Sequence, residues 1–442
     1  MPSSSTSISL TNKPNHEHLQ SLIESARPFL RNNIISLDKN LPNLLTILNS
    51  AGANECWHRL GTFSHHLFHV YRILKLWNVP NPICLFGFFH SVYSNSYHDL
   101  AIFNPETDRE TVRQHVGNVA ENLIYLFCVV PRHTLIHDDL VFKYTDYELR
   151  EDLRDSEQSL NSGNVKQDEK WRKKVQEVAP ETGILTTHIR TGEPVVIPRR
   201  VLAVFLLMTI ADFGDQYYGY QDDLYDNTNG RLEFTGNTNF DVLWPGNGKP
   251  GLWMNLVSKM AAVYTLLVRE EQILMQQKRP DPFEQPGRVK QTDPLERPDL
   301  LENGWFEEVE LVIPPVFEGC TKVLDPNEQI KARDIYWEVV YNDEKFDKEK
   351  SEEMLVKCIE MNPFVGEPHV LLSQFYMSRG RFEEGEREGE LGLGLLLEWG
   401  CCWDKRVSWE GWVAWCRVLL SKAKERSWPK TSWGIISLGL VK

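Results

Sequence analysis

The sequence lacks any apolar stretch that approaches the length needed to span a bilayer, which is about 20 residues. It also lacks a CxxC pair, and its 8 cysteines are scattered through a chain of 442 residues. We expect these cysteines to be free buried thiols. Acidic residues outnumber basic ones, 62 against 48, and give a formal net charge of -14. Nucleic acid and an anionic membrane surface are therefore not expected as partners.

The N-terminal stretch MPSSSTSISLTNKPNHEHLQ contains no arginine and no apolar segment of signal-peptide length. A transit peptide is normally rich in arginine, and a secretory signal needs an apolar core. We therefore expect a cytoplasmic protein, with the chloroplast as the alternative location.

Helical periodicity dominates the chain, and only EPVVIP and VELVIPPVF show a short alternation typical of strands. The expected fold is therefore all-α. Composition divides the chain into an N-terminal helical segment (1–55), a helical domain (56–275), a proline-rich linker (276–310) and a second helical module (311–442). Residues 144–182 form a polar, highly charged insertion in the helical domain, which we predict to be a mobile loop or a solvated helix.

The stretch GTFSHHLFHVYRILKLW, residues 61–77, predicts an amphipathic helix. On a helical wheel His66 falls within the apolar stripe that faces the core. His65, His69 and Arg72 fall on the opposite, wetter face. One of the three histidines in this helix is therefore expected to point inward.

Two further polar residues follow long apolar runs. The segment ICLFGFFHSVY has hardly a polar position before His90, and RRVLAVFLLMTIADFGDQYY is apolar for about three turns before Asp212. An ionised carboxylate in such a run is costly to desolvate unless a cation or hydrogen-bond donors meet it. We expect His66, His90 and Asp212 to satisfy one another, either directly or through a metal ion.

The ordered set of motifs resembles the HD-domain superfamily of metal-dependent phosphohydrolases, most closely the hydrolase domain of the stringent-response alarmone enzymes. HLFHVYRIL is similar to the first element of that pattern through His66, FGFFHS to the second through His90, and TIADF to the third through Asp212. Residues 56–130 and 188–260 also resemble a family of domains of unknown function found in plants and bacteria, in which GLFHS.Y replaces the HD doublet. The resemblance implies an HD-like helical bundle.

The sequence departs from the alarmone-hydrolase pattern in two places. Ser91 stands where an HD site has its aspartate ligand, which by the resemblance is a trait of the smaller family. Ser94 and Asn95 replace a Glu-Asp pair that would orient water. The ligands that remain, His66, His90 and Asp212, form a two-histidine, one-carboxylate face. Such a face suits Fe(II), Mn(II) or Zn(II) and leaves positions open for water or substrate.

Two functions are compatible with these residues. In the first, the protein is a metal-dependent hydrolase of a phosphate ester or nucleotide, which is the chemistry that the superfamily resemblance implies. In the second, the two histidines are core residues hydrogen-bonded to Asp212 and Ser91 without a metal, and the protein is a non-catalytic scaffold. The sequence leaves both open and identifies no catalytic nucleophile or base.

Literal His-Asp pairs occur elsewhere, but neither follows an apolar helical run. YHDL contains His98 and Asp99, and LIHDDL contains His137. Both are expected in loops. The first pair could fold back over His90 and complete a site, whereas His137 is expected at the surface.

Arginines near these helices are candidates for substrate binding. RETVRQHVGNVAENLIYLFCVVPR predicts an amphipathic helix that includes Arg113 and starts at Arg109, and Arg199 lies at the start of the Asp212 helix. Guanidinium groups bind phosphate or carboxylate in a bidentate manner. We predict a substrate-binding role for these three residues, with ordinary solvated arginines as the alternative.

The C-terminal stretch HVLLSQFYMSRGRFEEGEREGELGL resembles one tetratricopeptide repeat, and the segment before it resembles a degenerate one. The residues at the packing positions of the repeat are Leu372, Ser373, Tyr376, Gly380, Phe382 and Gly385. One and a half repeats cannot bury a solenoid face alone. We therefore expect this tetratricopeptide-like module to pack on the first domain or to bind a protein partner through residues 330–442.

Overall fold

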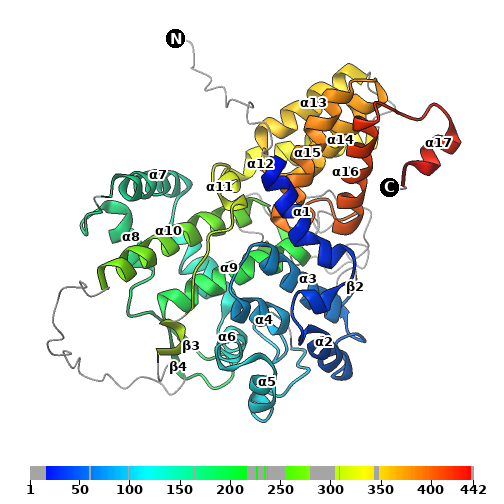
Figure 1. The fold of residues 1–442 in the computed structure, drawn as a ribbon. Helices are drawn as coiled ribbons and strands as arrows, with labels where there is room; N and C mark the ends of the chain where they lie inside the picture. The colour runs from blue at the N-terminus through cyan, green and yellow to red at the C-terminus, as the bar shows by residue number, and fades with distance from the viewer. Residues whose placement is uncertain are drawn as a thin grey trace, which may run out of the picture.

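The computed structural model describes residues 16–58, 61–97, 99–163, 165–216, 225–226, 233–234, 236, 254–278, 304–307, 309–342 and 348–439. These residues are mostly helical, and their strands form only two-stranded antiparallel pairs (Figure 1). The all-α fold expected from the sequence is confirmed.

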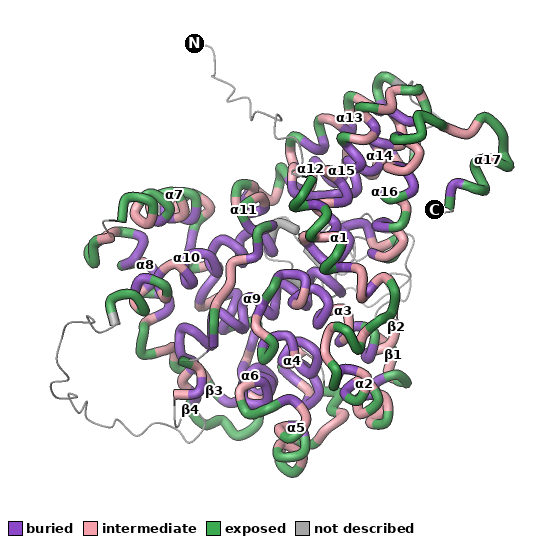
Figure 2. The backbone as a smooth tube through the Cα atoms, viewed as in Figure 1, coloured by how far each residue is buried: buried purple, intermediate pink, exposed green. Residues whose placement is uncertain are grey.

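The helices of the first part of the chain surround one central helix. They are α1 (His16–Leu30), α2 (Leu41–Ser50), α3 (Phe63–Leu76), α4 (Asn81–Phe89), α5 (Arg109–Val116), α6 (Asn118–Val129), α7 (Asp146–Ser162), α8 (Lys170–Val178), α9 (Arg199–Gln216) and α10 (Met254–Lys278). Every residue of α9 is buried, and α9 packs against α3 and α10 (Figure 2). A side chain on α9 therefore lies in the interior whichever way it points.

The strands are short and peripheral. The antiparallel pairs are β1 (Trp57–His58) with β2 (Gly61–Thr62), β3 (Ile184–Thr187) with β4 (Pro194–Ile197), and β5 (Tyr225–Asp226) with β6 (Glu233–Phe234). In the longest pair Ile184 lies opposite Ile197. The candidate EPVVIP contains β4, whereas the described part of VELVIPPVF contains no strand and runs into a helix.

Local sequence signals fix the start of α3, which contains His66, and the start of α4, which ends next to His90. Thr62 caps α3, since its hydroxyl oxygen accepts a hydrogen bond from the backbone N–H of His65. Pro82 lies in the first turn of α4, where a missing N–H has no cost. Because α4 ends at Phe89, His90 is the residue that caps its C-terminal end.

The C-terminal part of the chain is a succession of helical hairpins. Its helices are α11 (Val316–Cys320), α12 (Pro326–Asn342), α13 (Lys348–Met361), α14 (Gly366–Ser378), α15 (Phe382–Trp399), α16 (Trp409–Lys424) and α17 (Ser432–Ile436). Helix α12 packs against α13, and α14 packs against α15. This arrangement suits the tetratricopeptide-like prediction, although the relationship itself stays a prediction.

The C-terminal helices pack directly on the first part of the chain. Helix α15 contacts both α1 and α3, and the indole N–H of Trp77 donates to the carbonyl oxygen of Glu398 at 3.0 Å (Figure 1). Buried apolar side chains from α1 to α16 form one continuous cluster. Most of the proline-rich linker at 276–310 lies outside the described residues, and the division into domains stays a prediction.

The polar insertion at 144–182 is helical in most of its described residues. Helices α7 and α8 both pack against α10. Thr145 and Glu148 form a capping box at the start of α7, and Arg172 of α8 is buried in an ion pair with Glu270 of α10. Of the two alternatives drawn from composition, the helix is correct, but one of its faces is buried rather than solvated.

Close packing of α14 on α15 leads to a prediction about glycine. A Cβ atom at Gly392 would lie 2.9 Å from Val370 Cγ2 and 3.0 Å from the carbonyl oxygen of Gly366, whereas one at Gly394 would meet nothing within 4 Å. We expect Gly392→Ala to lower the free energy of unfolding by about 1–3 kcal/mol through overpacking. Gly394→Ala on the same helix should raise it by about 0.5–1 kcal/mol. Urea denaturation of both variants measures the two signs, and equal effects would contradict the packing.

Among the described residues, no single helix is long and apolar enough to cross a membrane, although the bent pair Asn118–Val129 and His133–Lys143 reaches that length and composition together.

Candidate metal centre

Three buried side chains from separate helices meet in the interior. His66 lies on α3, His90 follows α4, and Asp212 lies on α9; each is at most 4% exposed. These are the three residues that the sequence nominated as metal ligands, and the structure brings them together. Their donor atoms all lie within 4.8 Å of one another, so the group could hold a metal ion.

The separations between the donor atoms match those around a small metal ion. His66 Nε2 lies 3.2 Å from Asp212 Oδ1 and 3.4 Å from His90 Nε2, and His90 Nε2 lies 3.7 Å from Asp212 Oδ1. Ligands bound tetrahedrally at about 2.1 Å are separated from each other by about 3.4 Å. A metal ion therefore fits between the three donors with small adjustments.

Hydrogen bonds on the far side of each imidazole orient both rings. His90 Nδ1 lies 2.8 Å from the carbonyl oxygen of Gly87, which can only accept, so Nδ1 carries the proton. His66 Nδ1 lies 2.8 Å from Asp215 Oδ2, which fixes the same tautomer when the ring is neutral. Both Nε2 lone pairs then point into the cluster, as in a histidine that binds a metal and donates its other N–H to an acceptor.

Burial and the charges within the cluster shift the pKa values of the two histidines in opposite directions. Burial alone would lower the pKa of His66, but hydrogen bonds and charge interactions with Asp212 and Asp215 outweigh it and raise that pKa to about 9. Burial lowers the pKa of His90 to about 4, against the opposing charge of Asp212. Burial would raise the pKa of Asp212, but the hydrogen bond from His66 and the nearby cationic groups hold it well below its usual range. A metal-free cluster is thus an ion pair between His66 and the carboxylates, beside a neutral His90.

Neighbouring groups complete the charge balance. A guanidinium nitrogen of Arg132 lies 3.7 Å from Asp212 Oδ2, and the same guanidinium stacks over the ring of Phe127. Gln216 donates its side-chain N–H to Asp212 Oδ1. Asp215 was not singled out in the sequence, although it lies three residues after Asp212; the i, i+3 spacing on one helix is the signal that places both on the side of α9 facing His66.

Ser91 does not act as the aspartate of an HD doublet would. Its hydroxyl accepts a hydrogen bond from Asn95 Nδ2 at 2.9 Å. His90 meets Asp212 and the carbonyl of Gly87 instead. Of the hydrogen bonds expected for a metal-free core, the one between His66 and Asp212 is present at 3.2 Å, whereas His90 and Asp212 make only a long contact at 3.7 Å.

A pocket of about 300 Å³ adjoins the cluster on the side of His66. It lies between α3 and the segment that connects α15 to α16. The charged and imidazole-bearing residues among those that line it are His58, His65, His66, His69, Arg72, Asp215, Lys405 and Glu410. Solvent and small molecules therefore approach His66 and Asp215 from a surface rich in basic side chains.

Arg72 corrects the sequence prediction, which placed it on a wetter face. It is only 3% exposed. Its Nε donates to the carbonyl oxygen of Gly400 at 3.0 Å, its NH1 group pairs with Glu410, and its guanidinium lies 4.5 Å from the ring centroid of Trp409. The C-terminal helices cover this face of α3, and no helical wheel reports what a distant segment covers.

His137 was also predicted at the surface, and that prediction is wrong. It is 3% exposed and lies in a single π-helical turn, His133–Asp138. Its ring packs against Phe142 and Phe213. His98 lies outside the described residues, so the suggestion that the His98–Asp99 pair completes the site stays a prediction.

The three arginines predicted to bind substrate all have internal partners. Arg109 forms a bidentate pair with Glu121 at 2.7 and 2.9 Å, and Arg113 joins the same carboxylate at 2.9 Å. Arg199 is buried and lies 3.3 Å from Glu271. None of the three is among the described residues that line the pocket beside His66. Their substrate-binding role stays a prediction.

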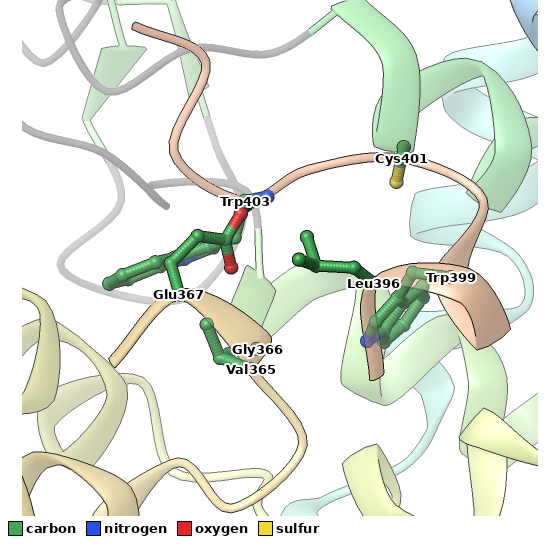
Figure 3. Close-up of a pocket in the computed structure, with 7 residues that line it drawn as sticks. All are labelled: Val365, Gly366, Glu367, Leu396, Trp399, Cys401 and Trp403. Carbon is green, nitrogen blue, oxygen red and sulfur yellow. Dashed lines mark hydrogen bonds between the residues drawn. The ribbon is translucent and has the colours of Figure 1, made fainter. Parts of the chain in front are cut away.

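The segment between α15 and α16 is held in place by a buried carboxylate, Glu367. Its Oε1 accepts the backbone N–H groups of Trp403 at 2.6 Å and Asp404 at 3.0 Å. Figure 3 shows this carboxylate between Trp403 and Leu396, at the edge of a small cavity that also meets Cys401. Burial raises the pKa of Glu367 to about 7, because the backbone hydrogen bonds only partly offset the loss of solvation.

This raised pKa gives a pH-dependent stability. The folded protein holds a proton on Glu367 that the unfolded chain releases near 4.5, so this contribution to stability is full below pH 4.5 and is lost as the pH rises through about 7. We expect Glu367→Gln, which keeps the acceptor oxygen, to be more stable than the natural protein by an amount that grows between these pH values, to about 3–4 kcal/mol. Urea titrations of both proteins at several pH values measure this difference. A constant difference would contradict it.

Comparison with known proteins identifies one segment. Residues 47–132 match a family described as Domain of unknown function (DUF6817). The matched segment contains His66 and His90, whereas Asp212 lies outside it. No curated protein and no solved structure matches the chain. The expected likeness to an uncharacterised family is confirmed over this segment, and the HD-domain relationship stays a prediction.

Proposed function

We propose that the protein is a metal-dependent hydrolase whose metal is held by His66, His90 and Asp212. The observation that supports this most strongly is the orientation of the two imidazoles. Each donates its Nδ1–H away from the cluster, to Asp215 and to the carbonyl of Gly87, and directs Nε2 toward Asp212. When both rings are neutral, two nitrogen lone pairs and a carboxylate converge at 3.2–3.7 Å, and a shared cation satisfies all three.

The donor set suits Fe(II), Mn(II) or Zn(II), and three protein ligands leave coordination positions open. When bound, such an ion lowers the pKa of a coordinated water toward neutrality and so supplies a nucleophile for hydrolysis. The chain contributes the rest. Asp215 holds the His66 ring, Gly87 holds the His90 ring, and Arg132 offsets the charge of Asp212. The buried α9 closes the inner side of the cluster, so substrate enters from the pocket beside His66.

The substrate class we propose is a phosphate ester or a nucleotide. The pocket has room for a small metabolite at about 300 Å³, and Lys405 and the imidazoles in its lining support an anionic one. The choice of phosphate among anions rests on the likeness of the three motifs to the HD superfamily.

Product release from a substrate panel tests this proposal. The protein is loaded with Mn(II) and incubated with p-nitrophenyl phosphate, bis(p-nitrophenyl) phosphate and the nucleoside mono-, di- and triphosphates. We expect metal-dependent hydrolysis that falls more than about a hundredfold in His90→Ala. His115→Ala, on α5 and away from the pocket lining, is the control. Turnover that survives in His90→Ala or after chelation of the metal would refute the assignment.

A non-catalytic scaffold is the second function, and one observation favours it. Without a metal, His66 and Asp212 form a buried ion pair at 3.2 Å, so the core can persist with no ligand. Under this proposal residues 330–442 bind a protein partner, and the exposed side chains of Trp433, Ile435 and Ile436 on α17 are the surface available for it. Failure to bind Fe(II), Mn(II) or Zn(II) would favour this function over the hydrolase.

A further inference from the structure

The C-terminal part of the chain supplies one wall of the pocket beside His66. Of the residues that line the pocket, those from Cys401 to Ser408 belong to the connection between α15 and α16, and Trp409 and Glu410 are the first residues of α16. The opposite wall is α3 with the β1–β2 hairpin that precedes it. A ligand that enters the pocket therefore touches a segment far outside the part of the chain that resembles the HD superfamily.

This connection together with the first two residues of α16, which we call the 400–410 wall, is anchored at both ends and in its middle. Gly400 accepts a hydrogen bond from Arg72, and Glu410 pairs with the same guanidinium. Glu367 accepts hydrogen bonds from the backbone N–H groups of residues 403 and 404. Figure 3 shows its carboxylate next to Trp403. Side chains on the 400–410 wall are thus presented to the pocket in a fixed geometry, which specific ligand contacts require.

Lys405 is the cationic side chain on the 400–410 wall that lines the pocket. Its ammonium donates to the carbonyl oxygen of Gly214, the residue before Asp215, near the C-terminal end of α9. A cation is favoured there by the partial negative charge of the last carbonyls of the helix. The contact places the ammonium next to Asp215, whose other neighbours are His66 and His69. Lys405 therefore lies beside Asp215, which in turn contacts the candidate metal ligand His66.

The ammonium of Lys405 decides the net charge that the pocket presents to a bound ligand. Among the described lining residues, Arg72 and Lys405 are offset by Asp215 and Glu410. A divalent ion held by Asp212 and two neutral histidines adds one net positive charge beside them. The loaded site is then positive overall, and loss of the ammonium at residue 405 would make it neutral. Affinity for an anion should follow this balance, because the charges lie within a few ångströms of one another around a concave, partly buried pocket.

We infer that Lys405 is a substrate-positioning residue that binds an anionic group of the substrate in the pocket beside the metal centre. The C-terminal helices are in this way part of the catalytic unit and set its specificity. The inference rests on the proposed metal site. If Lys405 only capped α9 through the carbonyl of Gly214, a change in the charge of its side chain would leave the affinity for anions unchanged. If Lys405 binds the anion, loss of that charge lowers the affinity.

Calorimetric titration of inorganic phosphate into the Mn(II)-loaded full-length protein tests the inference, with manganese content measured on every sample. We expect Lys405→Met to weaken phosphate binding about tenfold or more, the effect of losing one charge-assisted hydrogen bond. Lys405→Arg should stay within about threefold of the natural protein. Glu410→Gln should bind phosphate several times more tightly, because it removes a negative charge from the lining. The exposed Lys331→Met is the matched control.

The outcomes separate the two proposals. One equivalent of manganese in every sample, with equal phosphate affinity in the natural protein and Lys405→Met, would overturn the role of Lys405 and leave the metal site intact. No manganese in the natural protein would overturn both. If Lys405→Met fails to fold, the remaining variants decide: tighter binding in Glu410→Gln with near-natural binding in Lys405→Arg supports the inference, whereas weaker binding in both shows a purely structural contact.

Discussion

Replacing His90 by alanine should abolish metal binding at the proposed centre. The variant removes one of three converging donors and leaves His66 and Asp212 to form their ion pair at 3.2 Å. We expect metal content, measured by elemental analysis, to fall from about one equivalent per chain to below about a tenth. Saturating metal should stabilise the natural protein by about 3–4 kcal/mol at 100 to 1,000 times its dissociation constant and leave the variant unchanged.

The control for this experiment lies on the same helix as one of the ligands. His65 is exposed and adjacent to His66 in sequence, and its ring is not one of the three donors. His65→Ala should therefore retain about one equivalent of metal. His66→Ala should behave as His90→Ala does. Equal metal content in all three variants would show that the ion binds elsewhere on the protein and that the buried cluster is structural.

Replacing Arg172 by methionine should destabilise the protein more than any surface substitution. Arg172 forms a bidentate pair with Glu270 at 2.7 and 3.0 Å, and the two side chains are 4% and 1% exposed. Methionine has a similar length but leaves the carboxylate of Glu270 buried without its cation. We expect a loss of about 3–5 kcal/mol in the free energy of unfolding, a large part of the stability of a typical domain. Urea denaturation measures the loss.

Two further variants identify the cause of that loss. Lys173→Met changes the exposed neighbour of Arg172 on α8 and should shift stability by no more than about 0.5 kcal/mol. The double variant Arg172→Met, Glu270→Met removes both charges and should recover most of the stability, since no buried charge is left unpaired. A double variant as unstable as the single one would show that packing of α8, and not the charge of Glu270, carries the effect.

The three candidate ligands could be predicted from sequence because each is determined locally. His66 falls on the apolar stripe of its own helix, and His90 and Asp212 follow apolar runs that have to be buried. The helical fold has the same origin, since period and capping residues are local signals. What the sequence left open was whether the rings turn their lone pairs inward, and that depends on Asp215 and the carbonyl of Gly87.

The features that sequence reasoning missed all depend on distant partners. Arg72 was placed on a wet face, but Gly400 and Glu410, which cover it, lie 328 and 338 residues further along the chain. The charge of the insertion suggested solvent, yet Arg172 is neutralised by Glu270, 98 residues away. Amphipathic periodicity gives the direction of a side chain relative to its own helix, and it contains no information on which remote segment packs there.

The packing of α1 on α15 has a consequence for how the protein is made. Helix α1 is synthesised before the α15 surface that it contacts, which follows roughly 350 residues later, or about 20–70 s of synthesis at ordinary elongation rates. Throughout that interval the face of α1 that contacts α15 lacks its partner, whereas Phe29 already has Phe68 and Tyr71 of α3 to pack against. Until α15 is made, that face of α1 is an apolar surface to which a chaperone can bind, and the contact between α1 and α15 is a late event in folding on the ribosome.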